Sequence, residues 1–386
     1  MGRRVLITDA GTATALAAAR SLDRAGFRVT VLASSRHDPA AASRAVSAVI
    51  RAPDPLVDSE GFTARVAHAL TARRFDLFLP VSDAALLLAD RIRDRIPPWT
   101  AVALPSPEKL ALLLDKRAVL DRAAALGIPV LPRRGPERFP EAPLPAVLKP
   151  GRSRVIGWGR VLAATSRVVG DRRALIEEGD RLVRAGHGAY AEPWVPGEGR
   201  GIFLLLHRGE VLARFAHRRI REASPLGGPS AVAESVPADP ELLRWSEALA
   251  RDLGAEGPFM AEFRGVGDDC VLLEVNARLW GSLALAVAAG VDFPALLAAS
   301  LSGEPARGPA VFRTGVRLRH LALDLRGLWH AALGPPSGVD IPWPGRLRAA
   351  GRVLGTRARG MFLTPEDPAP ARAALLSLLS RMKPHG

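Results

Sequence analysis

Short apolar runs alternate with helical patterns over the first 105 residues. The runs predict strands at 5–8, 28–32, 46–50, 76–80 and 100–104. Amphipathic stretches between them predict helices at 12–25, 61–72 and 84–94. Strands that alternate with helices indicate a parallel sheet joined by crossover helices, so we expect an α/β domain here. The turn after the first strand lacks full GxGxxG spacing and predicts an ordinary strand-to-helix turn. Asp83 is expected to cap the helix at 84–94, and the alternative is a place in the lining of the substrate pocket.

After residue 105 the pattern changes to hairpins and separate helices. It predicts two helices within 106–127, further helices at 171–184 and 240–253, strands at 146–149, 161–164 and 189–195, and hairpins within 202–215 and 258–277. A basic loop containing glycine, 150–160, follows the strand at 146–149. Helical segments separated by proline and glycine breaks fill 311–386. We therefore divide the chain at 1–105, 106–190, 191–310 and 311–386.

Composition is that of a globular protein, with 48% hydrophobic and 24% charged residues. The single cysteine excludes an intrachain disulfide framework and, with no signal-peptide pattern at the N-terminus, favours a cytoplasmic location. The apolar stretch 282–301 is interrupted by Asp292 and Pro294, which favours two packed helices over a membrane span.

Net charge is +14, and the last 86 residues hold thirteen basic and five acidic side chains. Such a tail is compatible with nucleic-acid binding. No nucleic-acid-binding motif accompanies it and aromatic residues make up only 5% of the chain, so a solvated basic surface is the preferred interpretation.

Lysines are rare, with four among the 53 basic residues. Lys149 ends a predicted strand and opens the basic loop, where a phosphate-binding cation is expected, and Lys116 lies just inside a helix that Asp115 can cap. Because arginine cannot replace a compact, mobile ammonium group, these two positions favour a nucleotide site.

The predicted hairpin at 258–277 brings acidic residues together. Its turn falls at 265–269, which places Glu262 opposite Glu274. Side chains alternate along a strand, so Glu274, Asn276 and Arg278 share one face, and directly opposed residues project to the same side. Leu273, Val275 and Ala277 are expected on the other face.

Opposed carboxylates destabilise a hairpin unless something neutralises them. A divalent cation, Mg²⁺ or Mn²⁺, would do so, and carboxylate and amide oxygens are the ligands that such ions prefer. A solvated hairpin with a polar outer face fits the same pattern, so both interpretations stay open.

Together these segments resemble the ATP-grasp superfamily of carboxylate–amine or carboxylate–thiol ligases over roughly residues 1–300. The similar segments, in family order, are DKRAVLDRAAALGIPVLP (115–132), PAVLKPGRSRVIGWGR (145–160), AEPWVPGEGRG (191–201), AHRRIREASPLGGPSAVAES (216–235) and FMAEFRGVGDDCVLLEVNARLWGS (259–282). The resemblance implies a Rossmann-like pre-grasp domain, a two-lobed α+β ATP-grasp fold and a C-terminal helical tail. It also implies that 150–160 is a flexible phosphate loop and that 216–235 is a basic loop facing the phosphates.

The resemblance also implies a role for each matching residue. Lys116 and Lys149 would contact the phosphates of ATP, and Glu192 and Val195 would bind adenine through their backbone. Glu198 would accept hydrogen bonds from the ribose. The implied Mg²⁺ ligands are Glu262, Glu274 and Asn276. The residues implied to stabilise the transferred phosphoryl group or the acyl phosphate are Arg278, His217, Arg218 and Arg219.

These expectations describe an enzyme that activates a small, amino acid-like carboxylate as an acyl phosphate and joins it to an amine. Small-molecule substrates are the expected partners, without nucleic acid or membrane, and a homodimer is left open. Three alternatives remain: a nucleotide-binding regulatory module without turnover, a ligase forming carboxyphosphate from bicarbonate, and a nucleic-acid partner using the tail. The arginine-rich 150–160 segment, with fewer glycines than is usual for the family, motivates the first alternative.

Overall fold

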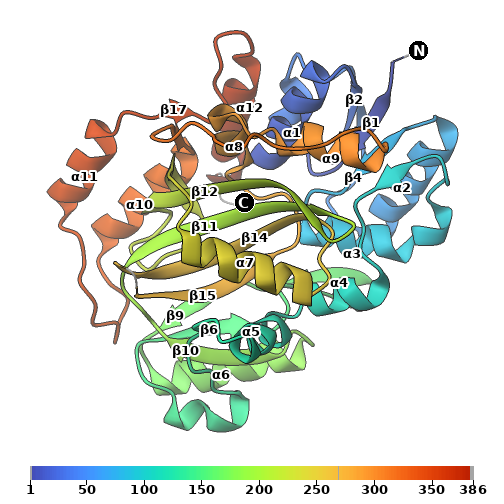
Figure 1. Ribbon diagram of the computed structural model, residues 1–386. Coiled ribbons are helices and arrows are strands. Elements are labelled where there is room, and N and C mark those ends of the chain that lie inside the picture. The colour runs from blue at the N-terminus through green and yellow to red at the C-terminus, as the bar shows by residue number, and fades with distance from the viewer. Residues whose placement is uncertain (1, 268, 383–386) are drawn as a thin grey trace.

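The computed structural model describes residues 2–267 and 269–382 (Figure 1). In this part of the chain the strands form a five-stranded, a three-stranded, a seven-stranded and a two-stranded sheet. The seven-stranded sheet lies at the centre, with the five-stranded domain above it and the three-stranded lobe below it in the view of Figure 1.

The amino-terminal domain is built on a parallel sheet, as predicted. Its strand order is β3-β2-β1-β4-β5, with β1 (Arg4–Ile7), β2 (Arg28–Ala33), β3 (Ala48–Arg51), β4 (Leu77–Leu79) and β5 (Ala101–Val102). Alternate strand residues are buried against opposite faces. Helix α1 (Ala13–Arg24) covers one face, and α2 (Ser59–Ala72) and α3 (Asp83–Arg91) cover the other. Strands β2 and β3 are added on one side of β1, and β4 and β5 on the other, so the strand order reverses at β1 and creates a switch point of the kind where ligands bind in such sheets.

A small lobe follows after α4 (Pro107–Leu113) and α5 (Lys116–Ala125). Its antiparallel sheet has the order β10-β6-β9, formed by β6 (Ala146–Pro150), β9 (Arg167–Val169) and β10 (Ala189–Pro193), and α6 (Arg172–Arg184) packs on it.

The segment expected to be a flexible phosphate loop is a hairpin, β7 (Arg154–Gly157) and β8 (Arg160–Ala163). Its two-residue turn has positive φ at both Trp158 (49°) and Gly159 (75°), which is the turn geometry that suits the twist of paired strands. The hairpin rests on the amino-terminal domain. Val161 packs in the core with α2, and its backbone N–H donates to Ser59 Oγ at 2.8 Å. The expected loop is therefore a paired hairpin, held by its turn and by the packing of Val161, and its flexibility stays a prediction.

The central sheet has the order β15-β14-β11-β12-β13-β16-β17. Its strands are β11 (Glu198–His207), β12 (Glu210–Glu222), β13 (Ser230–Ser235), β14 (Gly257–Val266), β15 (Asp269–Asn276), β16 (Arg317–Arg319) and β17 (Arg359–Gly360). Helices α5 and α7 (Pro240–Asp252) cover one face. The other face packs against α8 (Leu283–Ala289) and α9 (Phe293–Leu301), which also contact α1, so one apolar core joins the central sheet to the amino-terminal domain.

The basic segment at 216–235, expected as a loop, consists mostly of strands. Strand β12 continues to Glu222 and pairs with β13, which leaves only 223–229 as the connection. The last part of the chain contains the predicted helices, α10 (Leu321–Leu333), α11 (Arg346–Gly355) and α12 (Ala369–Met382). It also adds β16 and β17 to the central sheet, which the sequence pattern did not predict.

No single helix in the described part of the chain is long and apolar enough to cross a membrane. Helices α8 and α9 reach that length and apolarity only as a pair, and the pair is bent by 91°.

Candidate active site

A row of four residues crosses the central sheet at the predicted acidic position. His217 of β12 pairs with Gly201 of β11, Gly201 with Glu262 of β14, and Glu262 with Glu274 of β15. The predicted opposition of Glu262 and Glu274 is thus present in the strand register. Because residues directly opposed across strands project to the same side, the two carboxylates lie on one face.

A β-bulge interrupts the hairpin immediately beside these carboxylates. Glu262 pairs with Glu274, but the next pair is Phe263 with Leu272, so Leu273 has no strand partner. Leu272 and Val275 are both in the core, whereas Leu273 was expected on the same face as Val275. That expectation was wrong because the extra residue reverses the alternation.

Lys116 is the cation paired with Glu274. Its Nζ lies 2.5 Å from Glu274 Oε2, and its position at the start of α5 is fixed by the side chain of Asp115, which accepts from two backbone N–H groups of that helix. Burial would raise the pKa of Glu274, but the charges of Lys116 and Lys149 outweigh it and lower the pKa to about 2. Glu274 is therefore a carboxylate at neutral pH.

Arg219 is the cation paired with Glu262, at 2.5 Å between Nη2 and Oε2. Its side chain passes over Gly199 of β11, where an added Cβ would lie 2.8 Å from Arg219 Cδ. Burial raises the pKa of Glu262, and the charge of Glu274 adds to this although Arg219 opposes it. The two opposed carboxylates thus differ in pKa, Glu262 being held above its ordinary value and Glu274 below it.

Lys149, on β6 of the small lobe, also reaches strand β15 beside Glu274. Its ammonium group forms an ion pair with Glu192 on the neighbouring strand β10 and donates to the backbone carbonyl of Leu273 at 3.2 Å. Both side chains are buried, and burial raises the pKa of Glu192 even though Lys149 opposes it. The chain then turns through Trp194 and Val195, and the Trp194 indole donates to the Leu226 carbonyl at 3.1 Å.

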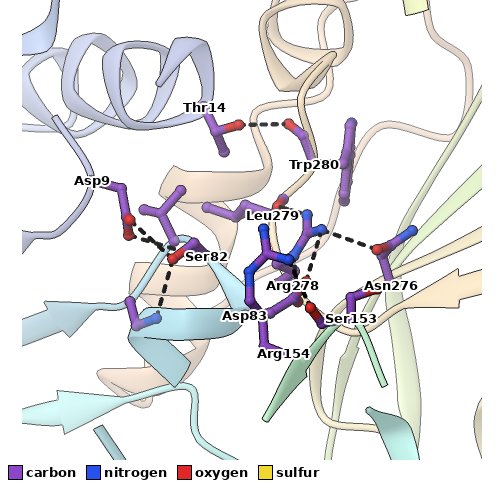
Figure 2. A network of polar contacts seen from close by, with 12 residues as sticks. Asp9, Thr14, Ser82, Asp83, Ser153, Arg154, Asn276, Arg278, Leu279 and Trp280 are labelled. Atoms are coloured by element: carbon purple, nitrogen blue, oxygen red, sulfur yellow. Dashed lines mark hydrogen bonds and ion pairs between the residues drawn. The ribbon is translucent and has the colours of Figure 1, made fainter. Parts of the chain in front are cut away.

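Arg278 connects the acidic face to the amino-terminal domain (Figure 2). Its Nε donates to Asp83 Oδ1 at 2.6 Å, and its Nη2 donates to Asn276 Oδ1 at 3.1 Å. Asn276 Nδ2 in turn donates to Glu274 Oε1 at 3.3 Å. Burial would raise the pKa of Asp83, but the facing guanidinium lowers it overall. The helix cap predicted for Asp83 is made instead by Ser82, whose side chain accepts from Ala85 N.

Strand alternation separates the three basic residues predicted together at 217–219. Arg219 reaches Glu262, whereas Arg218 pairs with Glu234 at 2.7 Å and lies 3.5 Å from Glu198. His217 is 1% exposed and packs edge-on against Phe203. Burial and the charge of Arg219 lower the pKa of His217 to about 3, so its imidazole is neutral at physiological pH.

The oxygen ligands on this face suit a hard divalent cation. Glu262, Glu274 and Asn276 supply two carboxylates and an amide, and waters or phosphate oxygens of a ligand would supply the rest. Within 2–267 and 269–382, no cluster of three or more His, Cys, Asp or Glu side chains forms a metal site. Two carboxylates and one amide leave several positions of such an ion open, so the face fits a cation that arrives with a phosphate ligand.

Two features of the site escaped sequence reasoning. Asp83 was assigned to a helix cap, because its partner Arg278 lies 195 residues away. Gly199 and Gly201 occupy alternate positions of β11 and leave space for Arg219 and His217, since a Cβ at Gly201 would lie 2.9 Å from His217 Nε2. The alternating glycines of the GEGRG sequence at 197–201 could have indicated that this strand leaves space for large neighbouring side chains.

Comparison with known proteins gives one family match and many structural matches. Residues 193–323 match the family described as "ATP-grasp in the biosynthetic pathway with Ter operon". No curated protein sequence matches significantly.

Three solved structures illustrate the structural similarity. A biotin carboxylase–β,γ-ATP complex from Campylobacter jejuni is 18% identical, with 82% of this chain and 74% of that chain covered and a TM-score of 0.64. The biotin carboxylase domain dimer of Hydrogenobacter thermophilus 2-oxoglutarate carboxylase, with MgADP, ADP and bicarbonate, is 14% identical, with 82% and 73% covered and a TM-score of 0.61. An L-amino acid ligase from Bacillus licheniformis is 20% identical, with 79% and 77% covered and a TM-score of 0.56.

The structure contains the predicted α/β amino-terminal domain, two-lobed α+β region and C-terminal helices, and these matches confirm the fold class. They also confirm the resemblance to the ATP-grasp superfamily that the motifs suggested.

Proposed function

Because this chain has the ATP-grasp fold, we propose that it is an ATP- and Mg²⁺-dependent ligase that activates a small carboxylate as an acyl phosphate and couples it to an amine. ADP and phosphate are the other products. The observation that carries this proposal is the meeting of two lysines from different elements on consecutive residues of β15. Lys116 bonds to the side chain of Glu274, and Lys149 bonds to the carbonyl of Leu273.

In this proposal the nucleotide lies between the small lobe and the central sheet. Lys116 and Lys149 bind its phosphates, and the backbone at Glu192 and Val195 holds the adenine. Glu198 binds the ribose, with Arg218 beside it at 3.5 Å. The ion pairs of both lysines support this arrangement, because a phosphate offers each ammonium group an anionic partner in place of a carboxylate.

Glu262, Glu274 and Asn276 hold Mg²⁺ in this proposal. When bound there, the ion would supply positive charge that polarises the transferred phosphoryl group and offsets its developing negative charge. Lys116 and Arg219 now neutralise the two carboxylates, so binding requires both side chains to give up these contacts or to share them.

A carboxylate oxygen of the substrate attacks the γ-phosphorus, the bond from that phosphorus to the β–γ bridging oxygen breaks, and ADP leaves. The amine nitrogen then attacks the acyl carbon, the carbon–oxygen bond to phosphate breaks, and the amine proton passes to solvent. Arg278 and Arg219 stabilise the charge that develops. His217 is buried and neutral, and its Nδ1 lies 3.2 Å from Ser282 Oγ, so in this proposal it brings no charge to the transferred phosphoryl group.

Product analysis tests the proposed reaction. Purified protein is incubated with ATP, Mg²⁺ and panels of carboxylates, with hydroxylamine as the acceptor. We expect ADP, phosphate and a hydroxamate, all dependent on Mg²⁺. AMP and pyrophosphate would contradict acyl-phosphate chemistry.

Bicarbonate is the second candidate for the activated carboxylate. Two of the similar structures described above are a biotin carboxylase and a biotin carboxylase domain, the latter with bicarbonate bound. ADP release that requires bicarbonate and no other carboxylate would favour this candidate over the amino acid-like substrate.

A further inference from the structure

Asp9 lies at the carboxyl end of β1, at the switch point of the amino-terminal sheet. Its backbone has a φ of 57°, in the left-handed region that few residues other than glycine adopt. Ser82, which follows β4, donates to Asp9 Oδ1 from its hydroxyl at 2.9 Å and to Oδ2 from its backbone at 3.2 Å. Thr8 also donates to this carboxylate. The side chain is thus fixed toward the region between the two strands.

All these donors are neutral. No lysine, arginine or histidine in the described part of the chain forms an ion pair with Asp9, and the residue is only half-buried, so a ligand has access to it. A carboxylate has about four acceptor positions, and three are used here. Burial raises the pKa of Asp9, and the hydroxyl and amide donors offset this only in part. A cation from outside the protein would complete the site.

A positive charge lies one residue further along the chain, where Asp83 forms an ion pair with Arg278 (Figure 2). Ser82 holds Asp9, and the following residue, Asp83, holds Arg278, so the two interactions begin on adjacent residues whose Cα atoms are about 3.8 Å apart. Arg154 of the β7–β8 hairpin is near enough to lower the pKa of Asp83. Ser82 thus contacts the carboxylate of Asp9, while the next residue, Asp83, contacts the guanidinium group of Arg278 and is influenced by that of Arg154.

We propose that Asp9 binds the ammonium group of a small amino acid whose carboxylate lies toward Arg278 and is the group activated by ATP. This inference rests on the proposed function and specifies its substrate class. The bound ammonium belongs to the activated substrate and not to the attacking amine. An ion-paired ammonium stays protonated and has no lone pair for nucleophilic attack.

The alternative role of Asp9 is structural, because its carboxylate accepts from the backbone N–H of Ser82 ahead of α3. Asp9→Asn separates the two roles. Asparagine tolerates the left-handed backbone and keeps an acceptor oxygen, but it loses the charge. Asp38→Asn is the matched control, since Asp38 accepts from the backbone of Ser34 and Ser35 after β2.

The test measures Mg²⁺-dependent ADP release with hydroxylamine as acceptor, for a panel of amino acids and the N-acetyl derivative of each. Nucleotide-analogue binding is followed in the same preparations by thermal shift. The wild type should favour the free amino acid, and Asp9→Asn should raise its KM about ten- to hundredfold, as expected for a lost charged hydrogen bond. The Asp38→Asn variant should keep the wild-type KM, and both variants should keep the nucleotide-induced shift.

Two contrary results have different meanings. Equal ADP release with free and N-acetylated compounds, or an unchanged KM in Asp9→Asn, would overturn the ammonium site while leaving the ligase proposal intact. A wild-type protein that neither binds the nucleotide analogue nor releases ADP with any compound would overturn the proposed function, and the ammonium site with it.

Discussion

The carboxylates on the β14–β15 hairpin and the carboxylate of Asp9 differ in the charge of their partners. Glu262 and Glu274 each have a cationic side chain within 2.5 Å, supplied by Arg219 and Lys116. Within residues 2–267 and 269–382, the donors to Asp9 are hydroxyl and amide groups. The negative charges of Glu262 and Glu274 are thus neutralised by side chains of the protein itself, so a ligand has to displace or share one of these cations. The negative charge of Asp9 has no cationic partner in the described part of the chain, so a cationic ligand can bind there without displacing a side chain.

The comparison also shows which contacts a ligand would change. On the hairpin face, phosphate would draw Lys116 away from Glu274 and so free an oxygen ligand for the metal. At Asp9, binding would add one ion pair to a site that is already ordered. The predictions below disturb these regions or the sheet that holds them, beginning with the largest expected effect.

Lys116→Met breaks the internal balance of the hairpin face. We expect nucleotide affinity to fall about tenfold or more, because a charged phosphate contact is lost. Mn²⁺ alone should bind more tightly than to the wild type, because Glu274 loses its competing cation. Calorimetry with the ATP analogue and with Mn²⁺ measures the two changes separately. Lys109→Met, which leaves these carboxylates untouched, is the control, and a parallel loss of both affinities would contradict the account.

Gly201→Ala tests the row that crosses the sheet. The added Cβ would lie 2.7 Å from Phe203 and 2.9 Å from His217, so buried side chains must move. We expect the free energy of unfolding to fall by about 1–3 kcal/mol, measured by denaturant titration. Gly351→Ala, at a position in α11 where a Cβ meets nothing within 4 Å, should cause no loss. Equal stability of the two variants would argue against the close packing of this row.

His217→Phe tests the neutral imidazole through the pH dependence of stability. The folded protein lowers the pKa of His217 from 6.5 to about 3, so the unfolded chain binds more protons between these values. The wild type should therefore lose stability as pH falls through this window, by about 1 kcal/mol per pH unit, and His217→Phe should lose less. Thermal melts between pH 7 and 5 measure the difference, with the exposed His68→Gln as control. If stability falls with pH equally in the wild type and in His217→Phe, the buried imidazole does not titrate as described.

The sequence predicted what depends on local alternation. The parallel amino-terminal sheet followed from apolar runs separated by helices, and the opposition of Glu262 and Glu274 followed from the turn position and the period of two. Both features depend on residues close together in sequence, where periodicity is informative.

The remaining features depend on irregular backbone or distant partners. The bulge at Leu273 has no residue signature, yet it reversed the expected face of that side chain. The 216–235 segment was assigned to a loop although most of it pairs as β12 and β13. Asp83 could not be assigned to Arg278, because the pairing exists only once the amino-terminal domain packs on the central sheet. The roles of individual site residues stay predictions until measured.

Metal binding in the presence of nucleotide tests the central claim most directly. Electron paramagnetic resonance can count Mn²⁺ bound to the protein with a non-hydrolysable ATP analogue, for wild type, Glu274→Gln and the ion-paired control Glu247→Gln of α7. The account predicts tight, nucleotide-dependent Mn²⁺ binding in the wild type and in Glu247→Gln, and its loss in Glu274→Gln. Unchanged Mn²⁺ binding in Glu274→Gln would show that the hairpin carboxylates do not hold the metal.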